Sequence, residues 1–599
     1  MPSIFWDGEK DGKMLDKGLE TKISFFPFRN SRLSLSLQKR GGALADVRNE
    51  NFVFIPCLGS HLSLSLSKTL SIFNEMTMKK VLLSVPLLCL IGIGLLMTTS
   101  TRAAAAPRQN TTAAIRLIPA PHSEEVPPDT HLTLEFDYPV QVNRQGMIRI
   151  FEAETGRLVD SLDLSIPAGP AQPDMIRKQK ATYSSIPYDY GSHGKRITNA
   201  NTRPGTPSGT ARQDTTGPYQ LTIIGGFSDG FHFYPVIVDG CRATIYPHHN
   251  LLEYDKSYYV TIDKEVFDLS LGEFAGIYDD QTWRFTTRRH APEAGRRLLS
   301  VNHDGSGDFC TVQGAMDFIP EFSDERWTVL IANGDYEELV YFRNKQNVLL
   351  RGENRDSVLI HYANNETFNP HPINVKTNEW PGTFPSRRAA FAADNCYDMR
   401  FENLTIQTDL QGQAEGLLLM GARNYLRNVR IVGSGDALQV NGSVYLEHCI
   451  VDGGGDMVLG RGPAFFKACT LQGPGPFMWI RNTEANHGNI FVDCRFIGSH
   501  PRSVLARSPL NRQPDGYPYA EAVLINCTLE NIAPEGWGPI EGSAHHVRFY
   551  EYNSRDKAGN PIDVSRRHPR SRQLTWPADS ALIEMYRNPA RILNWNPVW

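Results

Sequence analysis

The stretch from Ser434 to Gly460 reads SGDALQVNGSVYLEHCIVDGGGDMVLG and contains two closely similar phrases. Gly-Asp-Ala-Leu at 435–438 returns as Gly-Asp-Met-Val at 455–458, and each phrase follows a short run of alternating apolar residues at the same distance. One complete repeat therefore separates Asp436 from Asp456. Self-similarity at a fixed period of this length is typical of solenoid folds.

A related phrase recurs along residues 401–529, with Leu404, Val429, Cys449, Cys469, Cys494 and Cys527 as its fourth residues. The copies are FENLTI, LRNVRI, LEHCIV, FKACTL, FVDCRF and LINCTL. Alternation inside such a repeat predicts one strand per coil of a right-handed parallel β-helix, with the fourth position facing the core. Cysteine suits that position as a small buried hydrophobe, whereas a zinc site would need a close Cys-x-x-Cys pair, which the sequence lacks.

The repeat sets the two aspartates at matching points. Asp436 lies seven residues after Val429, and Asp456 lies seven residues after Cys449. Equal offsets in adjacent coils stack side chains about 4.8 Å apart. Two carboxylates that close are expected to split their pKa values, which suits a division of labour between nucleophile and acid. The spacing alone equally allows an aspartate ladder in turns that is satisfied by backbone N–H groups.

The wider composition agrees with an all-β protein of more than one domain. A chain of 599 residues is too long for a single ordinary core, and its 49 glycines and 39 prolines indicate structure rich in turns. Short alternating runs across residues 113–290 favour an antiparallel sandwich and resemble the Ig-like domains of exported bacterial enzymes, with residues 170–216 expected to form a long loop. The β-helix domain is predicted over 298–599, and the sandwich is interpreted as a spacer or docking module.

The leader is interpreted separately. Residues 78–105 carry two lysines, an apolar run and small residues ending in Ala-x-Ala, which predicts a signal peptide, with a membrane anchor as the alternative. Residues 1–77 show no pattern that builds a domain and are interpreted as an unstructured upstream extension from a start codon assigned too early. We therefore expect a bacterial protein exported to the periplasm, the cell surface or the medium, without stable membrane insertion. A net charge of −4 does not suggest a nucleic-acid partner.

From Leu298 onward the sequence resembles the pectin methylesterase (pectinesterase) family. The phrases that carry the resemblance, in family order, are VNHDGSGDFCTVQGAMDFIP (301–320), IANGDYEELV (331–340), GQAEGLLL (412–419), GDAL (435–438), GDMVLG (455–460) and VLARSP (504–509). The family has glutamine where this chain has Gly435, and an aromatic residue at both 457 and 459, where this chain has methionine and leucine.

The resemblance implies roles for four residues. Asp456 would be the nucleophile toward a uronic acid methyl ester, and Arg507 would hold it ionised. Asp436 would be the acid and then the base, and Gln413 would donate to the oxyanion. A backbone N–H of Gly435 or Gly455 is the expected substitute for the missing glutamine donor. No metal or organic cofactor is implied.

Four aromatic residues are candidates for stacking on sugar rings, with ordinary turn and loop packing as the alternative: Phe477, Trp479, Tyr517 and Tyr519. The expected partner is pectin or a related methylated polyuronate, bound by a monomer. Two alternatives to an esterase stay open. One is another polysaccharide enzyme on the same scaffold, a polygalacturonase or a calcium-dependent lyase, and the other is a catalytically inactive carbohydrate-binding protein.

Overall fold

The computed structural model describes residues 114–169, 219–225, 231–369, 387–509, 516–540 and 544–598, together with four isolated pairs of strand residues. The chain divides into two compact units, residues 1–107 and 108–599. Within the first unit, β1 (Ser36–Leu37) pairs antiparallel with β2 (Ala45–Asp46). The predicted signal peptide at 78–105 and the rest of the predicted extension lie outside the described residues.

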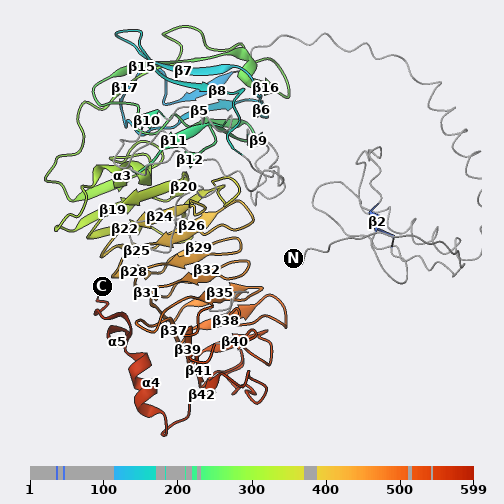
Figure 1. The fold of residues 1–599 in the computed structure, drawn as a ribbon. Coiled ribbons are helices and arrows are strands. Elements are labelled where there is room, and N and C mark those ends of the chain that lie inside the picture. Colours follow the sequence, from blue (N-terminus) through green and yellow to red (C-terminus); the bar gives the residue numbers. More distant parts are fainter. Residues whose placement is uncertain are drawn as a thin grey trace, which may run out of the picture. The chain divides into compact units, whose positions relative to one another are not determined.

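Two five-stranded sheets form the sandwich that begins the second unit (Figure 1). The first has the order β3 (Ile115–Ile118), β5 (Leu132–Phe136), β14 (Arg242–Ile245), β13 (Val236–Asp239) and β9 (Thr182–Tyr183). The second has the order β4 (Ser123–Val126), β17 (Arg284–Thr287), β15 (Ser257–Ile262), β7 (Met147–Glu152) and β8 (Leu158–Asp163). Apolar side chains of both sheets share one buried cluster, as the alternating pattern predicted. The immunoglobulin-like assignment stays a prediction.

Short strands complete this region. They are β6 (Val140–Val142) paired with β16 (Phe267–Leu269), and β10 (Gly209–Thr210), β11 (Leu221–Ile223) and β12 (Phe231–His232) in a small sheet of their own. Strands β9 and β10 fall within 170–216, where a loop was predicted; the rest of that segment lies outside the described residues.

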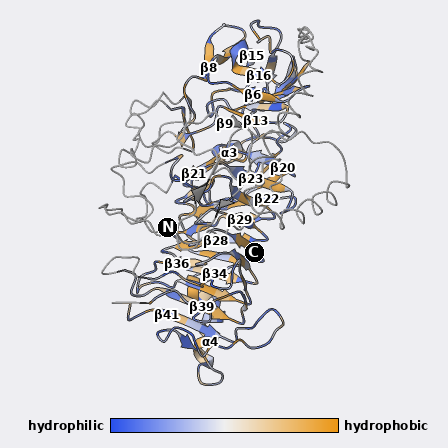
Figure 2. Ribbon diagram, turned by 90° about the vertical axis from the view of Figure 1, so that its right-hand side faces the viewer, coloured by the Kyte–Doolittle hydropathy of each residue, from blue (hydrophilic) through white to orange (hydrophobic). Residues whose placement is uncertain are grey.

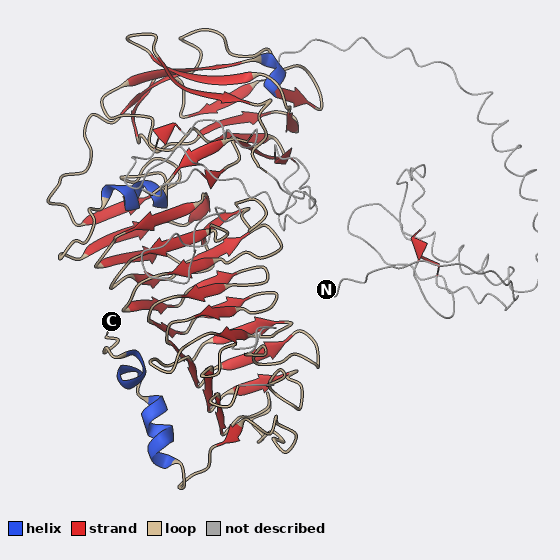
Figure 3. Ribbon diagram, in the orientation of Figure 1, coloured by secondary structure: helices blue, strands red, loops and turns tan. Residues whose placement is uncertain are grey.

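Beyond the sandwich, three parallel sheets run side by side as a β-helix (Figure 3). The first comprises β18 (Leu298–Val301), β19 (Trp327–Ile331), β22 (Val348–Gly352), β25 (Arg400–Glu402), β28 (Asn424–Arg427), β31 (Val444–Glu447), β34 (Ala464–Lys467), β37 (Asn489–Val492), β39 (Glu521–Ile525), β41 (Arg548–Tyr552) and β42 (Arg572–Gln573). The second comprises β20 (Gly334–Glu337), β23 (Val358–Tyr362), β26 (Thr405–Thr408), β29 (Arg430–Val432), β32 (Ile450–Asp452), β35 (Thr470–Gly473), β38 (Arg495–Gly498) and β40 (Thr528–Glu530). The third comprises β21 (Val340–Arg343), β24 (Phe391–Asp394), β27 (Leu417–Leu419), β30 (Leu438–Val440), β33 (Val458–Gly460) and β36 (Met478–Ile480).

The predicted parallel β-helix is confirmed, but the expectation of one strand per coil is wrong. Each six-residue phrase bends at its third residue, so that its two halves belong to different sheets. That residue has a positive φ in every copy, for example 57° at Asn403 and 55° at Asn526. Asparagine tolerates this left-handed conformation better than most residues, which makes a tight corner between two strands.

The fourth residues of the phrases face the core, as predicted. All six, including the four cysteines, are buried in one hydrophobic cluster that runs through the β-helix. The cysteine thiols are free and donate to backbone carbonyls, as Cys494 does to Val492. Figure 2 shows both hydrophobic and hydrophilic residues along the stacked strands, as expected for strands with one face in a core.

The sandwich and the first coils are held together by a shared contact and form one compact unit. Asp129 accepts hydrogen bonds from the backbone N–H and the hydroxyl of Thr311, at 2.8 and 2.7 Å. Thr311 is the N-cap of helix α3 (Val312–Phe318). A buried cluster joins Phe231 of β12 to Tyr341 of β21 in the β-helix, and a cavity of about 90 Å³ lies near this contact.

Two helices near the C-terminus, α4 (Ser580–Arg587) and α5 (Pro589–Leu593), pack on the outer face of the longest sheet (Figure 3). Their buried residues Ile583 and Ile592 belong to the same hydrophobic cluster as Phe465 of that sheet. Among the helices of the described ranges, none has both the length and the apolar character of a membrane span.

Candidate active site

The two aspartates lie at the start of neighbouring strands of the third sheet. Leu438 of β30 pairs with Val458 of β33, so Asp436 and Asp456, each two residues before these partners, occupy equivalent positions in adjacent coils. The N–H of Gly455 donates to the carbonyl of Gly435 at 2.9 Å, which ties the two turns together. Each carboxylate therefore lies in the electric field of the other, and Asp456 contributes to raising the pKa of Asp436.

Asp456 is held by one oxygen only. Arg507 donates from Nη1 to Oδ2 at 2.5 Å, while Oδ1 is buried and has no hydrogen-bond partner among the described residues. The backbone φ of Asp456 is 47°, a conformation that is uncommon for a residue other than glycine. Burial raises the pKa of Asp456, and the charge of Arg507 opposes that rise. The result is a carboxylate with one fixed and one uncommitted oxygen.

Asp436 has an arginine of its own, which the sequence did not indicate. Arg388, three residues before β24, donates from Nη2 to Asp436 Oδ2 at 2.6 Å. Burial raises the pKa of Asp436 to about 7; the charge of Arg388 opposes this rise, and the negative charges of Glu415 and Asp456 add to it. Near neutral pH this carboxyl group is therefore poised between its protonated and ionised forms.

Glu415 occupies the position equivalent to Asp436 and Asp456 in the preceding coil. Leu417 of β27 pairs with Leu438, so Glu415 stands two residues before its strand, as Asp436 does. It is fully buried and receives hydrogen bonds from Arg388 Nε at 2.9 Å and Nη2 at 2.7 Å. The signal was present in the sequence, because extending the register of the two aspartates back by one coil reaches this position.

Gln413 is oriented by the same arginine. Its side-chain oxygen accepts a hydrogen bond from Arg388 Nη1 at 2.9 Å. With the oxygen committed there, the amide nitrogen is left to donate elsewhere, which suits the role predicted for it. The predicted donor at Gly455 is not available, because its N–H is bonded to the carbonyl of Gly435.

Trp479 and Tyr517 form an aromatic pair beside Arg507, with their rings edge to face at 6.1 Å. The guanidinium carbons of Arg507 and Arg481 each lie 4.6 Å from the centre of the Trp479 ring. The Trp479 ring thus contacts two cations in addition to any sugar it would bind. Nothing in the sequence pattern marked Arg481 as part of this cluster.

The remaining two aromatic candidates lie differently. Tyr519 stacks on His546, with ring centres 4.9 Å apart. Phe477 is fully buried in the β-helix core, edge to face with Phe496 at 5.3 Å. The prediction that Phe477 stacks on a sugar is therefore wrong, because its ring faces inward and meets no solvent. Trp479 lies in β36 between the buried residues Met478 and Ile480, so the alternation of the strand puts its side chain outside that core.

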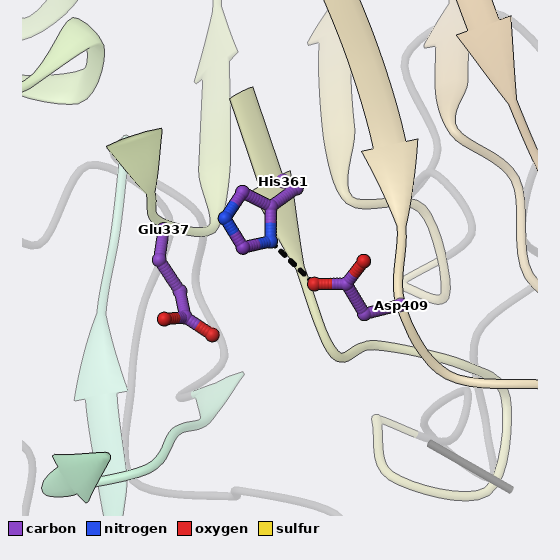
Figure 4. A group of neighbouring side chains, drawn as sticks. All are labelled: Glu337, His361 and Asp409. Carbon is purple, nitrogen blue, oxygen red and sulfur yellow. Dashed lines mark hydrogen bonds and ion pairs between the residues drawn. The ribbon is translucent and has the colours of Figure 1, made fainter. Parts of the chain in front are cut away.

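A second polar cluster lies on the neighbouring sheet, where Glu337, His361 and Asp409 have ligand atoms within 4.8 Å of one another (Figure 4). Both ring nitrogens of His361 are already engaged, Nδ1 by Asp409 and Nε2 by Asp335. Burial alone would lower the pKa of His361, but these bonds outweigh it and raise the pKa to about 9. An imidazolium has no lone pair for a metal, so we interpret the cluster as an ion-pair network.

Comparison with known proteins finds similar sequences and structures. Residues 299–573 match the family model described as Pectinesterase. Pectinesterase 31 of Arabidopsis thaliana is 25% identical over 293 residues, covering 47% of this chain and 89% of that protein. Probable pectinesterase/pectinesterase inhibitor 42 of the same plant is 32% identical over 139 residues, which span 23% of this chain and only 24% of that protein.

Two solved structures are similar at lower identity. Pectin methylesterase PemA from Erwinia chrysanthemi is 21% identical, with a TM-score of 0.40, over 51% of this chain and 99% of that one. The pectin methylesterase from carrot is 20% identical, with a TM-score of 0.40, over 51% of this chain and 95% of that one. The family match and the curated relatives support the assignment of residues 299–573 to the pectinesterase family.

Proposed function

We propose that the protein hydrolyses methyl esters of galacturonic acid residues in pectin and releases methanol. The observation that carries the proposal is the asymmetry of Asp456: Arg507 holds Oδ2, and Oδ1 is buried with no partner among the described residues. A carboxylate fixed by one oxygen keeps the other free for attack on an electrophilic carbon. Family membership supports the ester as that electrophile.

In the first half of the reaction, Asp456 Oδ1 attacks the ester carbonyl carbon, and the carbonyl electron pair moves to its oxygen. Gln413 donates its amide N–H to that oxyanion, an orientation that its bond to Arg388 favours. The bond to the methoxy oxygen then breaks while Asp436 gives it a proton, and methanol leaves. Asp456 and the uronate are left joined as an anhydride.

In the second half, the ionised Asp436 takes a proton from water, and the resulting hydroxide oxygen attacks the anhydride carbonyl. The bond to Asp456 Oδ1 breaks, the nucleophile regains its charge, and the free uronic acid departs. The same group must act first as an acid and then as a base. A pKa of about 7 suits both duties near neutral pH.

Methanol release from methylated pectin tests the proposal. We expect Asp456→Asn to lower kcat by at least about a thousandfold, because the amide is not a nucleophile. The matched control is Asp452→Asn, four residues earlier in the same coil, where the carboxylate bonds Arg430 and Gln472. Equal methanol release by wild type and Asp456→Asn, or none from a folded wild type, would sink the proposal.

The proposal includes export. The leader at 78–105 supports release of the mature protein outside the cytoplasm of a bacterium, where a plant polymer is accessible. N-terminal sequencing of the protein recovered from an expressing culture tests this, with a new N-terminus expected just after Ala105.

A further inference from the structure

Residues 231–234, which comprise strand β12 and the two residues after it, pack against the third sheet of the β-helix, which positions both aspartates. We call them the β12 segment. Phe231 and Tyr234 are fully buried there, in a cluster with side chains of β21, β24 and β27. The approach is close, because a Cβ added at Gly225 would lie 1.8 Å from the carbonyl oxygen of Tyr341 in β21. The β12 segment is therefore built into the packing around the candidate active site.

Phe231 is connected to both chain neighbours of Arg388. Its ring centre lies 4.6 Å from the guanidinium carbon of Arg387. It also lies 4.5 Å from the ring centre of Tyr341, whose hydroxyl donates to the carbonyl of Ala389 at 2.7 Å. A cation over the face of an aromatic ring is attracted to it, and more strongly when it is buried. Phe231 therefore supports the chain on either side of the arginine that holds the proposed acid.

The β12 segment also contacts residues 364–369, the stretch that follows β23. The backbone N–H of His232 donates to Asn369 Oδ1 at 2.8 Å, and Asn369 Nδ2 donates back to the carbonyl of His232 at 3.2 Å. The ring of Tyr234 stacks on that of Phe368, with centres 4.5 Å apart and planes at 9°. All four of these residues are buried. The two segments are thus joined by paired hydrogen bonds and by a ring stack.

Residues 364–369 in turn reach the candidate active site. The backbone N–H of Glu366 donates to the carbonyl of Gln413 at 2.9 Å, and its carboxylate accepts from Arg388 Nη1 at 3.2 Å. Asn364 Nδ2 donates to the carbonyls on either side of Arg388, at 2.8 and 2.7 Å. A continuous series of contacts therefore runs from the β12 segment to the arginine that bonds Asp436 and to the predicted oxyanion donor.

We propose that Phe231 is a positioning residue for the esterase reaction: the β12 segment fixes Arg388, which in turn holds Asp436 and orients Gln413. This rests on the proposed function and gives the region before the β-helix a part in it. A long arginine side chain is costly in entropy to immobilise, and a misplacement of about 1 Å can cost a hundredfold in rate. Packing from outside the β-helix reduces that freedom.

The direction of the expected pH effect follows from the charge of Arg388. Its guanidinium lowers the pKa of Asp436, in opposition to burial. If Arg388 is held less firmly, its field at Asp436 weakens and that pKa rises. Asp436 then keeps its proton to a higher pH, so the alkaline limb of the kcat/KM profile moves up.

The test compares Phe231→Leu with Phe233→Leu. Phe233 lies two residues further on and is also buried, but in the core of the sandwich. Both changes remove the same atoms from a buried position, so their effects on stability should be similar. We expect Phe231→Leu to lower kcat for methanol release at least about tenfold, with KM changed less than about twofold, and to raise the alkaline limb by on the order of half a pH unit. Phe233→Leu should match wild type in all three per folded molecule.

Amide hydrogen exchange tests the same contacts without the reaction. The N–H of Glu366 bonds the carbonyl of Gln413, and the N–H of Ala390 bonds that of Glu415 at 3.0 Å. We expect exchange at these two sites to be at least about tenfold faster in Phe231→Leu and unchanged in Phe233→Leu.

Three results would overturn the proposal: unchanged exchange in Phe231→Leu, an alkaline limb that stays in place there, or equal losses in both variants. If wild type releases no methanol while exchange at Glu366 and Ala390 rises in Phe231→Leu alone, the proposed function fails and the support of Arg388 by Phe231 stands.

Discussion

Arg388 Nη2 lies 2.6 Å from Asp436 Oδ2, so Asp436 has an arginine partner, as Asp456 has in Arg507. The two pairs differ in what surrounds them. Arg388 also bonds Glu415, which is fully buried, and therefore cannot neutralise Asp436 completely. Burial, with the added negative charge of Glu415, gives a carboxyl group that holds its proton near neutral pH beside one that is fixed for attack.

The pH dependence should follow from this arrangement. The pKa of Asp436 is raised to about 7, so the proton needed in the first step is lost as pH rises through that value, and kcat/KM should fall there. Glu415→Gln removes a like charge and should lower the pKa, moving the alkaline limb down by on the order of one pH unit. Profiles of methanol release test this. Glu366→Gln, which removes a weaker partner of Arg388 at 3.2 Å, should shift the alkaline limb of the pH profile less. An alkaline limb that does not move in Glu415→Gln would contradict the role of Asp436 as the acid.

Gln413 should matter for the rate and little for substrate binding. Gln413→Leu removes a donor to the oxyanion, which is worth about a hundredfold in kcat, with KM changed little. Steady-state kinetics on methylated pectin provides the measurement. Gln411→Leu, two residues away and also exposed, is the control. A rise in KM with kcat intact would show that Gln413 binds the sugar instead.

The His361 network should make stability depend on pH. Its pKa is about 9 in the folded protein against 6.5 for the free side chain, so the folded state holds the proton more tightly. The stabilisation is therefore complete below pH 6.5 and is lost as pH rises through about 9, by on the order of 3 kcal/mol. Urea unfolding at pH 6 and pH 9.5 should show this loss in wild type. It should be smaller in His361→Gln, and present in full in the exposed-site control His290→Gln.

Close stacking of coils should make Gly442 intolerant of any side chain. A Cβ added there would lie 1.4 Å from the carbonyl oxygen of Gly421 in the preceding coil. Because that contact is backbone, Gly442→Ala is expected to cost at least about 2 kcal/mol of unfolding free energy, or to prevent folding. Gly295→Ala, where nothing lies within 4 Å, should stay within about 0.5 kcal/mol of wild type. Equal stability of the two variants would contradict the tight packing of the turns.

The spacing of the repeat predicted more of the site residues than the type of each residue did. The equal offsets of Asp436 and Asp456 were legible from spacing alone, since a solenoid converts sequence period into spatial neighbourhood. The same spacing predicts that Glu415 lies beside Asp436 when the register is extended back by one coil. It fails for Arg388 and Arg481, whose side chains enter the site from flanking turns. The prediction for Phe477 failed for a related reason, because aromatic character does not say whether a side chain faces the core or the solvent.

By itself, the sequence determined the all-β class, the solenoid and its buried cysteine row, and the stacking of two acids, because these follow from period and alternation. Only the tertiary structure decided the bend in each phrase, the pairing of Asp436 with Arg388, and the contact of Arg481 with Trp479. The bend depends on a left-handed backbone conformation at one residue, and the two arginine contacts depend on where long side chains from different coils end. The spacing of the repeats determines where the backbone of each coil lies, whereas the position of an arginine guanidinium depends on how its long side chain packs.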